Sequence, residues 1–153
     1  MTDMSDSARE YVTAVVGGEL IGLPILGVQD VFVPEGVTRV PLAPPEIAGV
    51  INLRGRIVTL IDLRCRLGMS ARPDDAAIMA IGVEHDGESF GLVIDAIGEV
   101  LQLCDTDREP NPLHLDPRFA RVSTGIHRLD NRLLLVVDID RLLDIGAVIA
   151  TAA

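Results

Sequence analysis

The first residue in this sequence whose setting suggests chemistry is a serine between two glycines. The stretch Gly87-Glu88-Ser89-Phe90-Gly91 fits the G-x-S-x-G pattern, in which hydrolases hold a nucleophilic serine on a sharp strand-to-helix turn. Here the first glycine of the match belongs to an Asp-Gly pair, which is typical of a tight β-hairpin. A similar stretch, Gly18–Gly22, has Leu20 where Ser89 stands. We therefore expect Ser89 to lie on a hairpin strand, and a small serine hydrolase is kept only as an alternative.

The other chemistry-bearing residues form no catalytic or metal-binding pattern. The histidines are widely spaced and neither an H-x-x-x-H nor a C-x-x-C pair occurs, so we expect no metal site and no cofactor. Asp62 and Asp138 each end an apolar run, and we expect each carboxylate to accept backbone N–H groups of the following turn instead of acting as an acid or base. The chain contains no Lys, which excludes a Schiff-base lysine and a P-loop lysine.

One arginine is well suited to recognition. Arg54 lies in an Asn-Leu-Arg-Gly turn between two apolar segments, and Asp30 ends an earlier one. A guanidinium pairs bidentately with a carboxylate, so we expect an Asp30–Arg54 ion pair. That pair would hold three flanking side chains as an apolar patch with a polar centre, namely Val28, Val31 and Leu53. The alternative is a solvated Arg54 without a binding role.

Short apolar segments must position these residues. Runs rich in Val, Ile and Leu alternate with Gly-Gly and Asp-Gly pairs, which predict strands joined by hairpins. Two nearly continuous apolar runs, Ile57–Leu63 and Leu133–Ile139, indicate strands buried on both faces or exposed to a partner. Helical signal is limited to a turn at Leu63–Leu67 and a C-terminal segment that begins near Asp140. The pattern predicts a mostly β fold.

The chain also contains an internal duplication. Two pairs of segments align in the same order, Gly18–Ile25 with Gly87–Ile94 and Arg56–Leu63 with Arg132–Ile139. Repeats of this kind predict two similar β-subdomains, roughly residues 11–75 and 76–144, within a single domain of residues 11–144. Each half is marginal alone, because a chain of about 60 residues buries only about 60% of its unfolded surface. We therefore expect the halves to pack together.

Composition narrows the possible classes of protein. The 153 residues suit one domain, and 48% hydrophobic with 3% aromatic residues predicts an aliphatic core. A net charge of −10 disfavours nucleic acid and anionic membranes as partners. No apolar run is long enough to insert in a membrane, no secretory signal is evident, and Cys65 and Cys104 suggest no disulfide framework. We expect a cytoplasmic protein with a flexible N-terminus at residues 1–10 and a helical tail at residues 145–153.

A longer motif surrounds Arg54. Residues 49–58 have the sequence Gly-Val-Ile-Asn-Leu-Arg-Gly-Arg-Ile-Val, and Asp-Leu-Arg follows at 62–64. With Gly22–Ile25 and Leu134–Leu143, this motif resembles the CheW-like family of bacterial chemotaxis adaptors. The resemblance extends from Tyr11 to about Leu143. It implies two packed SH3-like five-stranded β-barrels with short helical segments, including the C-terminus, and a non-catalytic adaptor or scaffold.

The resemblance also implies partners. Adaptors of this family couple methyl-accepting chemoreceptors to the regulatory CheW-like domain of the histidine kinase CheA, in signalling arrays at the membrane. It implies a receptor-binding groove lined by Val28, Asp30, Val31, Gly49, Leu53 and Arg54, and a kinase-facing surface around Ile57 and Val58. Asp30 stands where the family commonly has Glu, so the ion pair is expected to be looser. A CheW-like adaptor of a pilus or surface-motility pathway has the same fold and stays an alternative.

Overall fold

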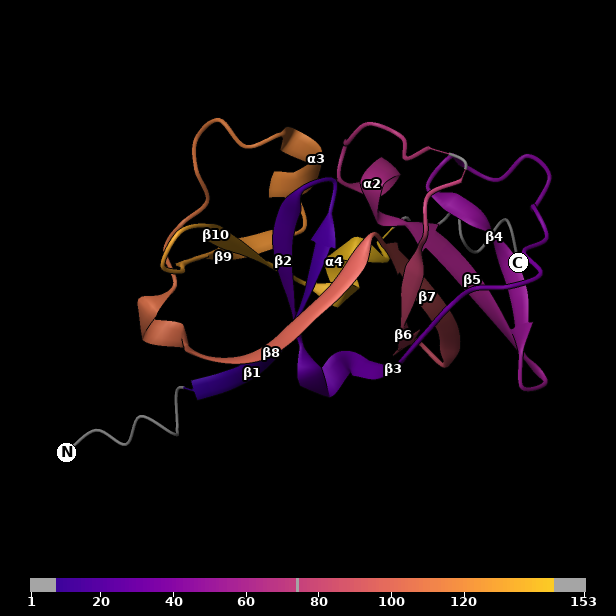
Figure 1. Ribbon diagram of the computed structural model, residues 1–153, viewed down its shortest axis with the longest axis horizontal. Helices are drawn as coiled ribbons and strands as arrows, with labels where there is room; N and C mark the ends of the chain where they lie inside the picture. Colours follow the sequence, from indigo (N-terminus) through magenta and orange to yellow (C-terminus); the bar gives the residue numbers. More distant parts are fainter. Residues whose placement is uncertain (1–7, 74, 145–153) are drawn as a thin grey trace.

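The computed structural model describes residues 8–73 and 75–144. Figure 1 shows two groups of strands side by side, with short helices at their connections. The mostly β fold predicted from the sequence is confirmed. The helical tail predicted for residues 145–153 lies outside the described residues.

Ten strands in the described ranges form two five-stranded sheets. Sheet A contains, in spatial order, β8 (Ala96–Cys104), β1 (Ala8–Val16), β2 (Glu19–Pro24), β10 (Leu133–Val137) and β9 (Ser123–Arg128). Sheet B contains β3 (Val28–Phe32), β6 (Met79–His85), β7 (Glu88–Ile94), β5 (Arg56–Asp62) and β4 (Ile47–Leu53). Both expected hairpins are present, as β1–β2 and β6–β7.

The predicted spatial division near residue 75 is wrong. Sheet A joins β1 and β2 to β8, β9 and β10, and sheet B joins β3, β4 and β5 to β6 and β7. Each sheet thus contains strands from both halves of the chain, and two parallel pairs join them, β2 with β10 and β5 with β7. Parallel strands cannot be joined by a short turn, so the partners in each pair come from distant segments. Repeated segments have equivalent pairing surfaces, so sequence comparison cannot tell which copy a strand will pair with.

The duplication itself is confirmed at the level of strand register. Val58 lies opposite Ser89, and Leu134 lies opposite Leu20, as the alignment of the repeats requires. The antiparallel pairs β3–β6 and β1–β8 have a β-bulge at the same place. The two sheets are therefore structurally equivalent although each is assembled from both halves.

Short helices follow the strands where capping residues are present. α2 (Leu63–Arg66) begins at Asp62, whose side chain accepts a hydrogen bond of 3.1 Å from the Arg64 amide. α4 (Ile139–Leu142) begins at Asp138, whose side chain accepts one of 2.9 Å from the Asp140 amide. The structural role predicted for these two aspartates is confirmed.

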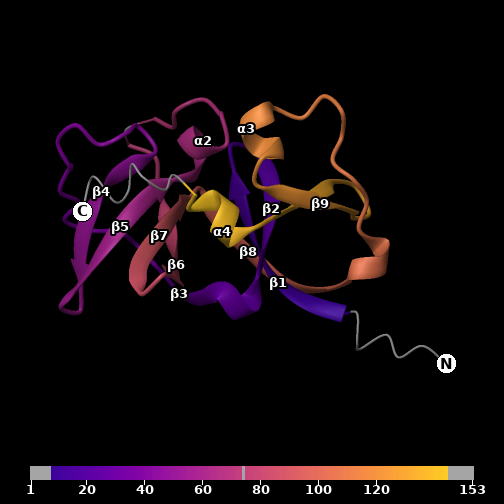
Figure 2. The same ribbon diagram turned by 180° about the vertical axis from the view of Figure 1, so that it is seen from behind.

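Three further short helices were not predicted. They are α3 (Pro117–Ala120) and the 3₁₀ turns η1 (Ile25–Gly27) and η2 (Asp105–Asp107). Asp116 caps α3, and proline occupies its first turn, a favourable position because proline has no N–H to leave unpaired. In both views α2 and α3 lie at the same end of the molecule, while Figure 2 shows α4 at the junction of the two sheets.

The predicted flexible N-terminus is too long. β1 begins at Ala8, and Arg9 pairs with Leu103 of β8. The Arg9 guanidinium also donates a hydrogen bond of 2.8 Å to Asp105. Backbone pairing along β8 therefore places residues 8–10 in a strand.

One large apolar cluster spans both sheets. It includes Ile21 and Leu135 from sheet A and Ile61 and Leu92 from sheet B, all buried. A smaller cluster lies within sheet B and contains Ile51, Val58, Leu60, Ala80 and Val93. The shared cluster explains why neither sheet is an independent unit, since each would expose this face without the other.

A polar network reinforces the contact between the sheets. Asp95 accepts hydrogen bonds from the Gly17 amide at 2.7 Å and from the guanidinium groups of Arg64 and Arg72 at 2.8 and 2.9 Å. Arg72 also pairs with Asp62 at 2.9 Å. Burial raises the pKa of Asp95, but hydrogen bonds from Arg64, Gly17 and Arg72 lower it by more, so the pKa lies below its ordinary value. The network links the β1–β2 turn of sheet A to α2, which follows β5 of sheet B.

We expect Asp95→Asn to lower the free energy of unfolding at pH 7 by about 1–3 kcal/mol, because hydrogen bonds to a charged carboxylate are lost. A depressed pKa stabilises the fold above the unfolded-state value of about 3.9 and ceases to do so as the pH falls through the folded-state value. The difference between the two proteins should therefore shrink below about pH 4. Urea denaturation at several pH values measures the free energy of unfolding of both proteins.

Asp130→Asn is the matched control, because Asp130 is exposed in the β9–β10 turn. It should change the free energy of unfolding by less than about 0.5 kcal/mol. Equal effects of the two substitutions would show that the network does not stabilise the fold.

Candidate functional site

Three of the six predicted receptor-binding residues line one surface hollow of about 200 Å³. We call it the Arg54 depression. Its walls are formed by residues from β3–β7 and the β4–β5 turn: Gln29, Asp30, Phe32, Leu53, Arg54, Arg56, Val58, Gly82, Ser89 and Phe90. Asp30, Leu53 and Arg54 are thus brought together from segments far apart in the sequence.

The β4–β5 turn holds the backbone of Arg54 in a strained, left-handed conformation. Arg54 has φ 54° and Gly55 has φ 82°, the left-handed values of a type I′ hairpin turn. The equivalent positions of the other hairpins are Gly17 and Asp86, which are residue types that tolerate these angles. A long side chain there costs of order 1–3 kcal/mol, and such strain clusters at functional sites.

Asn52 compensates part of this strain. Its side-chain oxygen accepts a hydrogen bond of 2.9 Å from the Gly55 amide, which closes the turn. The Asn-Leu-Arg-Gly order thus has a local structural reason in Asn52 and Gly55, while Arg54 remains exposed.

The predicted Asp30–Arg54 ion pair does not form. No salt bridge or hydrogen bond joins these two described residues. Asp30 lies on β3 and Arg54 in the β4–β5 turn, which are far apart in the sequence. Both residues line the Arg54 depression without pairing with each other.

The three other predicted receptor contacts lie outside this depression. Val28 packs against the large core cluster, whereas Val31 is 38% exposed on the other face of β3. Gly49 is buried, with φ 151°, and a Cβ there would lie 2.6 Å from the Thr38 carbonyl oxygen. Gly125 has the same role in sheet A, where a Cβ would meet the Glu109 carbonyl oxygen at 2.7 Å. Gly49 therefore allows a close backbone crossing and offers no surface.

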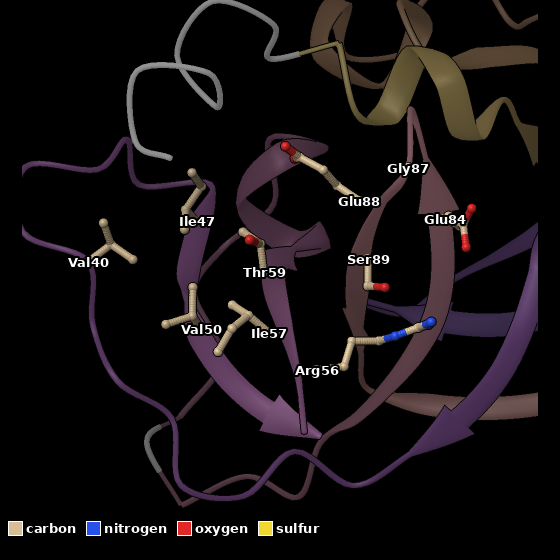
Figure 3. A pocket seen from close by; sticks show the side chains of 10 residues that line it. All are labelled: Val40, Ile47, Val50, Arg56, Ile57, Thr59, Glu84, Gly87, Glu88 and Ser89. Atoms are coloured by element: carbon tan, nitrogen blue, oxygen red, sulfur yellow. The ribbon is translucent and has the colours of Figure 1, made fainter. Parts of the chain in front are cut away.

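The two predicted kinase contacts, Ile57 and Val58, differ in exposure. Ile57 is 63% exposed, whereas Val58 is 3% exposed and belongs to the smaller core cluster, since consecutive strand residues face opposite sides. Ile57 lines a larger hollow of about 590 Å³, the sheet B groove, shown in Figure 3. The residues that line it are Val40, Ile47, Val50, Arg56, Ile57, Thr59, Glu84, Gly87, Glu88 and Ser89. Ile57 is therefore the exposed member of the predicted pair.

Ser89 lacks the geometry of a nucleophile elbow. It lies near the start of β7, opposite Val58, and the strand continues to Ile94. A G-x-S-x-G nucleophile stands instead on a strand-to-helix turn. The glycines of this motif belong to the hairpin and the strand, as the comparison with Gly18–Gly22 indicates.

One buried polar residue was missed by the sequence interpretation. His127 on β9 is almost fully buried, and its Nε2 has no hydrogen-bond partner among the described residues. Burial lowers the pKa of this imidazole. In the alignment of the repeats, His127 is equivalent to Ile51, which is a core residue. That alignment would have identified position 127 as a core position. Residues 8–73 and 75–144 contain no cluster of three metal-ligating side chains.

Comparison with known proteins decides the family. A family model described as the CheW-like domain matches residues 10–146. This chain belongs to the CheW-like family. The motif around Arg54, the duplicated sheets and the match over nearly the whole chain are therefore features of one family.

Relatives in this family match the chain over most of its length and over most of their own. CheW of Klebsiella aerogenes is 33% identical over 135 residues, which cover 88% of this chain and 81% of that protein. CheW of Helicobacter pylori is 29% identical over 139 residues, with 91% and 84% covered. The crystal structure of the scaffolding protein TtCheW from Thermoanaerobacter tengcongensis superposes with a TM-score of 0.78 at 31% identity, over 90% of this chain and 94% of that one. No described helix is long and apolar enough to span a membrane.

We expect Gly49→Ala to lower the free energy of unfolding by about 2–4 kcal/mol, because the new Cβ adds overpacking to backbone strain. Gly36→Ala is the matched control, since Gly36 has φ 65° with open space around it. That control should cost only about 1 kcal/mol. Chemical denaturation measures both values, and equal losses would contradict the close crossing at Gly49.

Proposed function

We propose that this chain is a non-catalytic cytoplasmic adaptor that couples methyl-accepting chemoreceptors to the histidine kinase CheA. Membership of the CheW-like family makes it a chemotaxis scaffold protein, and binding alone performs that task. The observation that carries the finer proposal is the strained display of Arg54 beside Asp30 and Leu53. A membrane-associated receptor array would recruit the adaptor through its partners.

The Arg54 depression is the proposed receptor surface. Arg54 can form a bidentate, charge-assisted hydrogen bond with a carboxylate of the receptor tip. Asp30 on the opposite wall can accept from a donor, and Leu53 adds apolar contact between them. Because Asp30 and Arg54 do not pair with each other, neither has to break an internal ion pair when the receptor binds. Val31 lies on the other face of β3 and is not part of this proposed surface.

The sheet B groove is the proposed kinase surface. Ile57 is its most exposed apolar side chain, and Val50 and Thr59 lie beside it in Figure 3. The regulatory CheW-like domain of CheA is the proposed partner there. Apolar anchors of this kind supply most of the binding energy in protein interfaces.

Signal transfer then requires no bond to be made or broken. A receptor conformation that contacts the Arg54 depression more favourably shifts the arrangement of adaptor and kinase, by no more than the difference in contact energy. Coupling of this kind typically amounts to about 1–3 kcal/mol. β5 connects the two surfaces directly, since Val58 lines the first and Ile57 the second.

We expect Arg54→Glu to abolish receptor-dependent stimulation of kinase autophosphorylation in a reconstituted assay, because like charges would then face a receptor carboxylate. The thermal unfolding midpoint should stay close to that of the wild-type protein, since the side chain is exposed. Arg132→Glu makes the same change of net charge in the equivalent β9–β10 turn and should retain stimulation. Full stimulation by the Arg54→Glu variant would refute the receptor surface.

We expect Ile57→Ser to weaken binding of the CheA regulatory domain at least about tenfold, equivalent to about 1.4 kcal/mol. Leu133→Ser is the control, because Leu133 occupies the equivalent position of sheet A. Titration calorimetry compares the two variants. Equal weakening by both would argue against the sheet B groove as the kinase surface.

A further inference from the structure

Two residues line both hollows of sheet B. Arg56, the first residue of β5, and Ser89 on β7 belong to the walls of the Arg54 depression and also of the sheet B groove. In Figure 3 the two side chains lie together on the β7 side of the groove. We name this pair the shared wall. A ligand group that contacts the shared wall from one hollow therefore changes the other hollow as well.

The shared wall offers hydrogen-bond donors that the described chain does not use. Arg56 is exposed, and its guanidinium forms no ion pair or side-chain hydrogen bond within residues 8–73 and 75–144. The Ser89 hydroxyl likewise has no hydrogen-bond partner in these ranges. A guanidinium and a hydroxyl can both donate to a carboxylate, and hydrogen bonds between charged groups are the stronger kind. The chemistry of the shared wall thus favours an acidic group of a partner.

The charges around the shared wall differ between the two hollows. In the Arg54 depression the other charged side chains are one guanidinium, that of Arg54, and one carboxylate, that of Asp30. In the sheet B groove the other charged side chains are both carboxylates, those of Glu84 and Glu88. An acidic group therefore finds two cations in the depression, whereas Arg56 is the single cation among the described residues that line the groove.

The duplicated fold shows a second position for this arginine. In the alignment of the repeats Arg132 is equivalent to Arg56 and Gly18 to Gly87, and the parallel pairs β2–β10 and β5–β7 have the same register. The Arg132 guanidinium donates a hydrogen bond of 3.4 Å to the Gly18 carbonyl oxygen. Gly87 lines the sheet B groove, but Arg56 donates no such bond to it among the described contacts. The fold thus accommodates this side chain both bound to the hairpin turn and free of it.

We propose that Arg56 couples the two hollows of sheet B by moving between them. From the groove side its guanidinium binds the Gly87 carbonyl oxygen or an acidic group of a partner. A carboxylate in the depression draws the guanidinium toward Arg54, and an acidic group in the groove thereby loses its cation. Coupling is reciprocal, so a group that holds Arg56 in the groove weakens binding in the depression by the same factor. That the two partners are receptor and kinase rests on the function proposed above.

The coupling is tested first in the full chain without a partner, with acetate as the carboxylate. NMR records the backbone amide signals of Gly82, which lines the depression, and of Gly87, which lines the groove. Acetate replaces chloride at constant ionic strength, so that screening stays the same. Both signals should shift in the wild-type protein. Arg56→Gln should abolish the Gly87 shift, whereas Arg132→Gln, the matched control in sheet A, should leave both shifts unchanged.

A third variant separates coupling from direct binding of acetate in the groove. Arg54 lines the depression and is not among the residues that line the groove. Arg54→Gln should therefore reduce the Gly87 shift if the hollows are coupled, and leave it unchanged if acetate binds in the groove itself. The proposal is overturned by a Gly87 shift that is unchanged in Arg54→Gln or in Arg56→Gln, or by the absence of a Gly87 shift in the wild-type protein.

The consequence for the proposed function is measured separately. Titration calorimetry gives the affinity of the full chain for the CheA regulatory domain, with and without a saturating chemoreceptor cytoplasmic fragment. The receptor fragment should weaken this binding at least about fivefold in the wild-type chain and less than about twofold in Arg56→Gln. Equal weakening in both chains would overturn the role of Arg56. Absence of kinase binding in every chain would refute the proposed function alone, because the acetate shifts depend on neither partner.

Discussion

The structure depends on two parallel strand pairs, β2 with β10 and β5 with β7. Each pair joins a strand of one repeat to a strand of the other, so each sheet is completed by the opposite half of the chain. The aliphatic side chains of β5 and β10 then form a core that both sheets share. Asp95 strengthens the same junction with hydrogen bonds from Gly17, Arg64 and Arg72. Neither repeat can bury its apolar surface without the other.

This shared framework leaves the edges and turns of the sheets free for recognition. The β4–β5 turn can hold Arg54 in a left-handed conformation because the paired strands on either side fix its geometry. β5 contributes consecutive residues to opposite faces, with Val58 under the Arg54 depression and Ile57 in the sheet B groove. The two proposed binding surfaces thus share one strand, and a displacement of that strand would alter both.

Duplication also shows where the two halves have diverged. Arg54 corresponds in position to Asp130, so the equivalent turns carry opposite charges. Arg132 donates a hydrogen bond to the Gly18 carbonyl oxygen, whereas the equivalent Arg56 makes no side-chain hydrogen bond among the described residues. His127 corresponds to Ile51 and introduces into the core of sheet A an imidazole nitrogen with no hydrogen-bond partner among the described residues. The framework is symmetric, whereas the surfaces that a partner would meet are not.

Local patterns in the sequence determined the strands of the Gly-Gly and Asp-Gly hairpins, β5, β10 and the capping roles of Asp62 and Asp138, because each depends on neighbouring residues. Comparison of segments within the sequence determined the repeats, and the motif around Arg54 indicated the family. Only the tertiary structure decided which repeat each strand joins, since equivalent segments can pair with either copy. It also decided that Asp30 and Arg54 line one depression without pairing, because the fold brings together segments that are far apart in the chain. Burial of Gly49 and Val58 likewise follows from packing against residues distant in the chain, which no local pattern records.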